Sequence, residues 1–216
     1  MKKILILLAL SLSVVVYAQE KLEEGILMVK VSMSSDDEQM NTQLAMVGDM
    51  ESTTYFKGQK SRNENNNPMT GEIITILDNE KKEMLMLMNN PMYGKMFAKS
   101  NIEMSEEDEK GIVIKKGEES KKILGYDCDQ YFVSANIQGQ EMEMEIFSTK
   151  EIIAYSQQTA TYGNKIEGFP LYVEMTMNQG PVKMTIVTET TDIKKELVSD
   201  DKFDMTPPKG YEEIKQ

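Results

Sequence analysis

Residues Glu72–Met88 read EIITILDNEKKEMLMLM, and this stretch decides the expected fold. Two short apolar runs flank the polar segment 78–82, which is the pattern of a β-hairpin with a short connection. In the second run Met84, Met86 and Met88 recur at every second position, which is the spacing of one face of a strand. The stretch therefore predicts two antiparallel strands, one of which has a face made of methionine.

Further segments with strand character lie on both sides of this hairpin. They are apolar or alternating, and several are separated by short polar breaks that contain glycine. They are GILMVKVSM (25–33), MVGDMESTTYFKGQKSRNEN (46–65, turning at 57–59), GIVIKK (111–116), GYDCDQYFVSA (125–135), EMEMEIF (141–147), and a closing hairpin over 168–196 that turns at 178–181. The turn spacing predicts an antiparallel meander of roughly eight to eleven strands.

Little helix is expected. Asn90-Pro91 resembles the start of a helix, since asparagine can cap it and proline suits its first position, and this helix is expected to fade by Ser100. Ser148 and Glu151 have the spacing of a capping box, which predicts a second short helix over 149–156. The polar stretch after Met33 is read as a loop. The expected fold class is mainly β (α+β), a curved antiparallel sheet with one or two covering helices.

The N-terminal residues MKKILILLALSLSVVVYA (1–18) have the features of a secretory signal peptide. Lys2 and Lys3 precede an apolar run that is short for a membrane span, and small residues precede the expected cleavage after Ala18. Residues 19–216 are then expected to form a single domain, exported to the periplasm or the extracellular space. The residue directly after the expected cleavage position is Gln19 and not the cysteine of a lipid-anchored lipoprotein, and no later apolar run is long enough for a transmembrane helix.

Charge and composition exclude several function classes. The chain has a formal net charge of −12, no histidine and one cysteine, Cys128. So acidic a protein is repelled by nucleic acid and by anionic lipid headgroups. Without histidine, the usual base for a catalytic thiol and most zinc ligand sets are missing. Cys128 is expected to be a small buried residue. We therefore expect no catalytic residues, no cofactor and no histidine-based metal site. We also expect the protein to be a monomer.

Methionine is the most informative residue type, with 19 in the chain. Its flexible, polarizable thioether suits surfaces that accept varied apolar partners, whereas a core made mainly of methionine would pack with little definition. If the methionine-bearing strands are neighbours in one curved sheet, their faces form one concave wall covered by the helix after Asn90. The candidate wall residues are Met84, Met86, Met88, Met92, Met96, Phe97, Met142, Met144, Ile146, Met175 and Met177.

Two other interpretations of these methionines stay open. They can simply fill a core, as apolar residues on one face of a strand usually do. They can also bind Cu(I), since soft thioether ligands select soft ions. The copper hypothesis is weaker, because period-two spacing is what any one-faced strand gives and no histidine is available.

Three motifs carry a resemblance to a known family. They are GYDCDQYFV (125–133), GFPLYVEM (168–175) and FDMTPPKGY (203–211), preceded by a hairpin containing YFKGQKSR (55–62). In this order they resemble an uncharacterised family of secreted Bacteroidetes proteins, a domain of unknown function. The resemblance implies a fold like the lipoprotein carriers LolA and LolB, an unclosed β-barrel with a hydrophobic concavity under helices. It transfers no site residue, and it leaves the role of Arg62, which family members often keep, undefined.

The expected function is non-covalent binding of a lipid, the acyl chains of a lipoprotein or another apolar ligand in the methionine-lined concavity. The alternative is a structural or protein-interaction module of the cell envelope with a filled interior and no small-molecule ligand.

Overall fold

The computed structural model describes residues 21–67, 71–103, 111–137, 140–156, 165–180 and 182–214. The predicted signal peptide lies outside these ranges. The strands are β1 (Glu24–Ser35), β2 (Met50–Lys57), β3 (Lys60–Asn67), β4 (Gly71–Asp78), β5 (Glu83–Asn90), β6 (Gly94–Asn101), β7 (Ile112–Ile123), β8 (Tyr126–Ile137), β9 (Gln140–Thr149), β10 (Phe169–Gln179), β11 (Val182–Lys194) and β12 (Glu212–Glu213).

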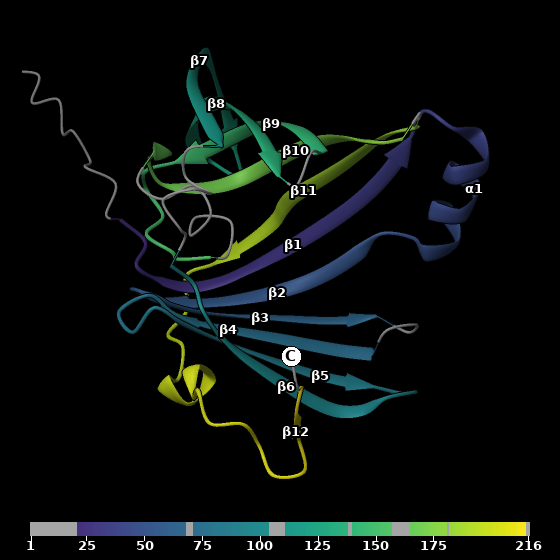
Figure 1. Ribbon diagram of the computed structural model, residues 1–216. Coiled ribbons are helices and arrows are strands. Elements are labelled where there is room, and N and C mark those ends of the chain that lie inside the picture. Colours follow the sequence, from purple (N-terminus) through teal and green to yellow (C-terminus); the bar gives the residue numbers. More distant parts are fainter. Residues whose placement is uncertain are drawn as a thin grey trace, which may run out of the picture.

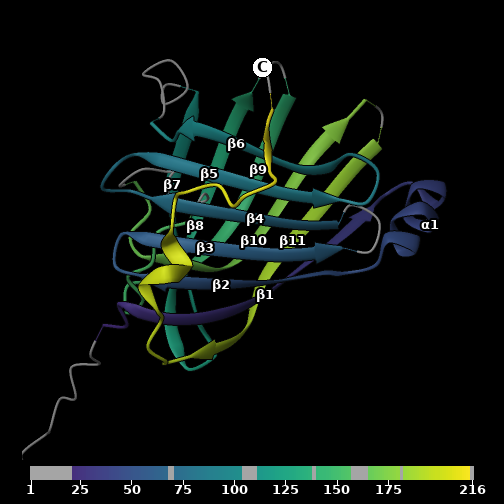
Figure 2. The ribbon, with the colours of Figure 1, turned by 90° about the horizontal axis from the view of Figure 1, so that it is seen from below.

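All of these strands belong to one sheet in the order β12-β6-β5-β4-β3-β2-β1-β11-β10-β9-β8-β7. Neighbours are antiparallel except β12 and β6, which pair in parallel. The sheet bends at β1, so that β2–β6 form one half and β7–β11 the other, and the strands of the two halves cross at an angle (Figures 1 and 2). The end strands β12 and β7 are not neighbours. The predicted fold class is confirmed: a mainly β protein with one curved, unclosed antiparallel sheet.

The α-helix of the described residues is not where the sequence predicted one. Helix α1 (Glu38–Val47) lies in the stretch read as a polar loop. Its N-cap is Asp37, whose side chain accepts a hydrogen bond of 2.7 Å from the amide of Met40. The helix buries no residue, although Met40, Leu44 and Val47 have the spacing of one apolar helix face in the sequence. It lies beside the end of β1 rather than over the concavity (Figure 1).

Both predicted helices are wrong. Pro91–Tyr93 form a turn and the following residues form β6. The Asn90 side chain does cap amides, accepting from Met92 (2.8 Å) and Tyr93 (3.1 Å), but it closes a hairpin turn. Pairing of β6 with β5 overrides continuation of the helix. At the second position, Lys150 and Glu151 form a turn and residues 153–156 have no regular structure.

We call the face that the two halves turn toward each other the inner face, and the opposite one the outer face. On the outer face of β4–β5, Ile74, Ile76, Leu85 and Leu87 form a buried cluster. The C-terminal segment, residues 200–214, covers this cluster, and its residues Met205 and Tyr211 pack against it. The short 3₁₀-helix η2 (Asp200–Phe203) belongs to this segment, seen in yellow in Figure 1.

Arg62 holds the C-terminal segment on the sheet. Its Nε donates to Glu64 Oε1 at 2.6 Å, and one of its terminal nitrogens donates to the carbonyl oxygen of Lys202 at 3.3 Å. The Lys202 ammonium donates to the same Glu64 oxygen at 3.1 Å and lies 3.9 Å from the centre of the Tyr55 ring. Arg62 therefore has a structural role on the outer face.

Neutralising Glu64 is expected to loosen this connection. Burial raises the pKa of Glu64, but the hydrogen bonds from Arg62 and Lys202 outweigh it, so its pKa lies below the usual range. Its stabilising effect is therefore present at neutral pH and lost as the pH falls through that lowered pKa. Glu64→Gln should cost about 1–3 kcal/mol of unfolding free energy at pH 7, and this loss should shrink as the pH falls through the lowered pKa. Urea titrations at a series of pH values from 7 downward check this, with Glu72→Gln as the control, since Glu72 is an exposed carboxylate on β4.

Cys128 is buried, as predicted, with 1% of its surface exposed. It belongs to a buried cluster in which residues of β8 pack with Leu27 of β1 and Phe56 of β2. Burial raises the pKa of its thiol to about 11, so almost no reactive thiolate exists near neutral pH. A disulfide reagent such as DTNB at pH 8 should label no thiol in the folded protein and one per chain after denaturation. Rapid labelling of the folded protein would contradict this packing.

Within the described ranges, no helix has both the length and the apolar character needed to cross a membrane.

Candidate functional site

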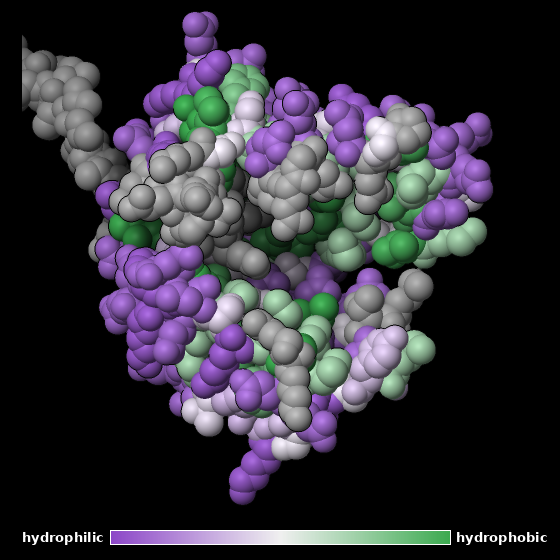
Figure 3. All heavy atoms as spheres, in the orientation of Figure 1, coloured by the Kyte–Doolittle hydropathy of each residue, from purple (hydrophilic) through white to green (hydrophobic). Residues whose placement is uncertain are grey.

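A pocket of about 260 Å³ lies on the inner face, where the two halves of the sheet meet. We call it the floor pocket. Its lining comes from both halves and contains Val29, Val31, Ser52, Thr54, Ser61, Asn63, Asn65, Thr75, Leu77, Ser156, Phe169, Pro170, Leu171, Val173, Thr188 and Thr190. Figure 3 shows a hollow between the two halves, with hydrophobic residues along its upper wall and hydrophilic ones in its depth.

The two parts of this lining differ in polarity. β1 and β10 contribute valine, leucine, phenylalanine and proline, whereas β2, β3, β4 and β11 contribute mainly hydroxyl and amide groups. The Asn63 side-chain amide donates to Ser52 Oγ at 3.1 Å and to Thr54 Oγ1 at 2.8 Å. The floor pocket is therefore amphiphilic and holds a preformed polar network.

The strand register places one group of the predicted wall residues beside this pocket. Met86 pairs with Thr75 and Met84 with Leu77, and both partners line the floor pocket. Paired residues of neighbouring strands share a face, so Met84, Met86 and Met88 lie on the inner face. Met96 lies there as well, because it pairs with Met88.

A second group lies on the inner face of the other half. Val173, which lines the floor pocket, pairs with Ile146. Farther along the same strands, Met175 pairs with Met144 and Met177 with Met142. Met177 also pairs with Met184 of β11, a residue that the sequence analysis did not select. The curved sheet thus brings two sets of methionines, far apart in sequence, onto one concave face.

These methionines differ in exposure from the leucines of the same strand. In β5, Leu85 is 0% and Leu87 4% exposed on the outer face. Met84, Met86 and Met88 are only partly buried. Leucine therefore occupies the face that the C-terminal segment covers permanently, and methionine the face that borders the hollow.

Two predicted wall residues do not belong to this surface. Met92 lies in the turn between β5 and β6 and is 81% exposed. Phe97 pairs with Leu87 and packs against the outer cluster. Both were chosen for a helical spacing, and the strand that replaces the helix sends alternate residues to opposite faces.

Part of the hollow is filled by the chain itself. Ile166 is buried against Tyr131, Val133, Ile146 and Val173, and Met144 borders this cluster. The Tyr131 hydroxyl is buried and has no hydrogen-bond partner among the described residues. Around Ile166 the inner face of β8–β10 is therefore packed, whereas the floor pocket beside this cluster stays open.

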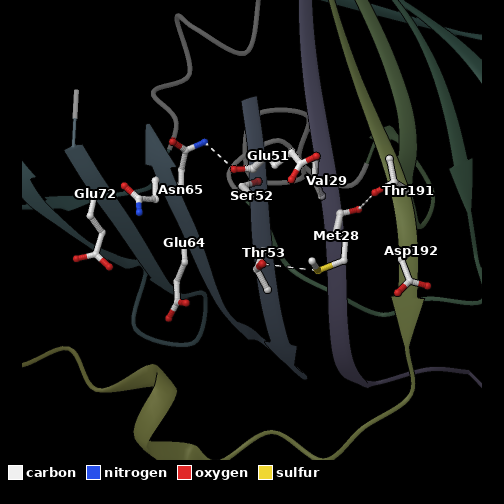
Figure 4. A pocket seen from close by; sticks show the side chains of 11 residues that line it. Met28, Val29, Glu51, Ser52, Thr53, Glu64, Asn65, Glu72, Thr191 and Asp192 are labelled. Atoms are coloured by element: carbon white, nitrogen blue, oxygen red, sulfur yellow. Dashed lines mark hydrogen bonds between the residues drawn. The ribbon is translucent and has the colours of Figure 1, made fainter. Parts of the chain in front are cut away.

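A larger depression of about 590 Å³ lies mainly on the outer face of β11, β1, β2, β3 and β4 (Figure 4). It carries Glu51, Glu64, Glu72 and Asp192, each from a different strand. Glu64 is already held by Arg62 and Lys202. Among the described residues, no group of three or more His, Cys, Asp or Glu side chains could hold a metal ion. We therefore take the smaller inner pocket as the candidate site.

The polar side of the site was not expected from the sequence. Residues 61–65 read SRNEN and were interpreted simply as a polar strand. The signal was the alternation within it: uncharged Ser61, Asn63 and Asn65 line the floor pocket, whereas charged Arg62 and Glu64 point outward. An alternation of uncharged with charged polar residues can thus mark the inner face of a strand.

Comparison with known proteins assigns the chain to a family. Residues 38–211 match the family described as "Domain of unknown function (DUF4412)". The chain belongs to this family. The match includes the β2–β3 hairpin and most of the C-terminal segment, which is hydrogen-bonded to Arg62 of this hairpin.

No curated protein matches the sequence. Two solved structures show a limited similarity. PNGF-II is 14% identical with a TM-score of 0.47, and the match covers 88% of this chain and 31% of that one. The chain thus spans about a third of PNGF-II. The Mycobacterium tuberculosis lipoprotein LppX is 6% identical with a TM-score of 0.32, covering 81% of this chain and 89% of that one.

Proposed function

We propose that this chain is an exported, non-catalytic binding protein that holds an apolar or amphiphilic ligand, such as a lipid, in the hollow of its sheet. The observation that carries the proposal is the division of side chains in β5. Its leucines are packed away on the outer face, and its methionines remain partly exposed on the inner face. If the interior were completely filled, the methionines would be as fully buried as the leucines, and this difference in exposure would not arise.

The energetics are sufficient for such binding. Burying apolar surface contributes about 25 cal/mol per Å², so a few hundred Å² of ligand would contribute several kcal/mol before the costs of association. The floor pocket, at about 260 Å³, is close to the lower end of the roughly 300–1,000 Å³ typical of ligand sites. The methionine-lined surface beside it provides the additional apolar area. Unbranched thioethers can adjust their rotamers to chains of different shape.

The test has two measurements. Protein purified without detergent should release a lipid-like compound into organic solvent, identified by mass spectrometry at a fixed ratio to protein. After delipidation, the protein should bind the neutral fluorescent probe N-phenyl-1-naphthylamine saturably. A folded sample with neither property would favour the alternative, a structural or interaction module of the envelope without a small-molecule ligand.

A further inference from the structure

We propose that the ligand carries an uncharged polar head, and that this head occupies the floor pocket while the apolar part lies along the methionines. The ligand class is a neutral amphiphile with hydroxyl, ester or amide groups, such as an acylglycerol. This inference rests on the proposed function and specifies its ligand.

Charged side chains are absent from the described lining of the floor pocket, which contains no Asp, Glu, Lys or Arg. The charged residues of the same strands alternate to the outer face, where they pair with one another, as Lys30 does with Glu189 at 2.7 Å. Burying an ionised head without a countercharge costs several kcal/mol. A carboxylate or phosphate head is therefore disfavoured in this pocket.

The lining of the floor pocket can form further hydrogen bonds. Ser52 and Thr54 accept hydrogen bonds from the Asn63 amide. Each hydroxyl keeps its own hydrogen to donate. The Asn63 side-chain oxygen accepts no hydrogen bond from the described residues. The pocket thus offers donors and an acceptor together, which matches a head that has both a carbonyl oxygen and hydroxyl groups.

The course of β10 sets the orientation of the ligand. Along β10, the pocket residues Phe169, Leu171 and Val173 are followed by Met175 and Met177. This direction leads toward α1. Met177 pairs with Met184 at the start of β11, this end of β11 pairs with the end of β1, and α1 follows β1. An alkyl chain in the floor pocket would remove water from the hydroxyls and replace no hydrogen bond. The head therefore points into the floor pocket and the chain toward the methionines.

The experiment compares two ligands with the same acyl chain. Delipidated protein is titrated at pH 8 with monolauroylglycerol and with laurate, each below its micelle concentration, and displacement of N-phenyl-1-naphthylamine is measured. Monolauroylglycerol should bind at least about tenfold more tightly, since laurate would bring an unpaired charge into the pocket. Equal affinities, or tighter binding of laurate, would overturn the neutral-head inference while leaving apolar binding in place.

Isosteric variants locate the head. Thr54→Val with Thr188→Val removes two pocket hydroxyls at nearly constant volume, and should weaken monolauroylglycerol about tenfold without weakening the apolar probe. The matched control is Thr53→Val with Thr185→Val, which alters the opposite face of the same two strands and should leave both affinities unchanged. Unchanged monolauroylglycerol affinity in the pocket variant would disprove the orientation. Absence of saturable probe binding in the unaltered protein would instead refute the proposed function itself.

Discussion

Changing Met144 to aspartate is expected to weaken binding of N-phenyl-1-naphthylamine by about 100-fold or more, which corresponds to about 2.7 kcal/mol. Met144 lies on the inner face of β9, paired with Met175 and beside the buried Ile146 cluster. A carboxylate there must either be desolvated by the ligand or keep water in the hollow, and both reduce apolar binding. Probe titration of the purified variant measures the effect.

Two further variants separate binding from folding. Met86→Asp places the same charge on the inner face of the opposite half, at a position that is only partly buried, and should also weaken the probe. Met92→Asp introduces it in the exposed β5–β6 turn and should leave binding unchanged. Circular dichroism must show that all three proteins are folded. Equal loss in all three, or in none, would refute the assignment of the inner face as the binding surface.

Replacing Gly168 with alanine is expected to have the largest effect on stability, about 3–5 kcal/mol of unfolding free energy. Gly168 has a φ of +90°, and a Cβ added there would lie 2.0 Å from the carbonyl oxygen of Thr149. The contact is with backbone at the end of β9, so it cannot be relieved by rotating a side chain. The start of β10, which lines the floor pocket, would have to move.

Gly180 is the matched control for this substitution. It also has a positive φ, +65°, but an added Cβ would meet no atom within 4 Å. Gly180→Ala should therefore cost only the conformational penalty of about 1–2 kcal/mol. Thermal or urea unfolding of both variants gives the comparison. Equal losses would show that the close approach of Gly168 to Thr149 is not what requires glycine.

The strands and hairpins could be predicted because their signals are local. Period-two alternation and short polar breaks correctly indicated β4–β5, β9 and the β10–β11 hairpin. The helices could not be predicted in this way, because the same side-chain hydrogen bonds to backbone amides occur at helix starts and in turns. Asn90 accepts the amide hydrogen bonds expected of a cap, yet the next residues extend the sheet. Asp37 caps a real helix whose periodic signal is limited to Met40, Leu44 and Val47, none of which is buried.

The candidate site was only partly accessible to sequence reasoning. The methionine alternation identified inner-face positions in β5, β9 and β10, but it could not show that Leu85 and Leu87 form the packed face of the same strand. That depends on the C-terminal segment, which lies more than a hundred residues away in sequence. The polar lining was missed because Ser52 and Asn63 look solvent-exposed until the bend of the sheet encloses them.

The structure also separates the roles of the motifs that carried the family resemblance. Segments 55–62 and 203–211 are brought together on the outer face, where Arg62 and the C-terminal segment stabilise the packed cluster. Segment 168–175 instead contributes Phe169 to Val173 to the floor pocket. Substitutions of Arg62 or within 203–211 should therefore affect stability before binding, whereas Ser61 of the first motif lines the floor pocket.

The failure of β12 and β7 to join has a mechanical consequence. A closed barrel has a circumference fixed by its strand number and stagger. Here the sheet formed by the described strands has two free ends. Its two halves can therefore move apart or closer together by a change in the coiling near β1, while the hydrogen bonds between neighbouring strands are kept. We expect the width of the hollow to adjust to the size of the proposed ligand, with changes in side-chain contacts alone.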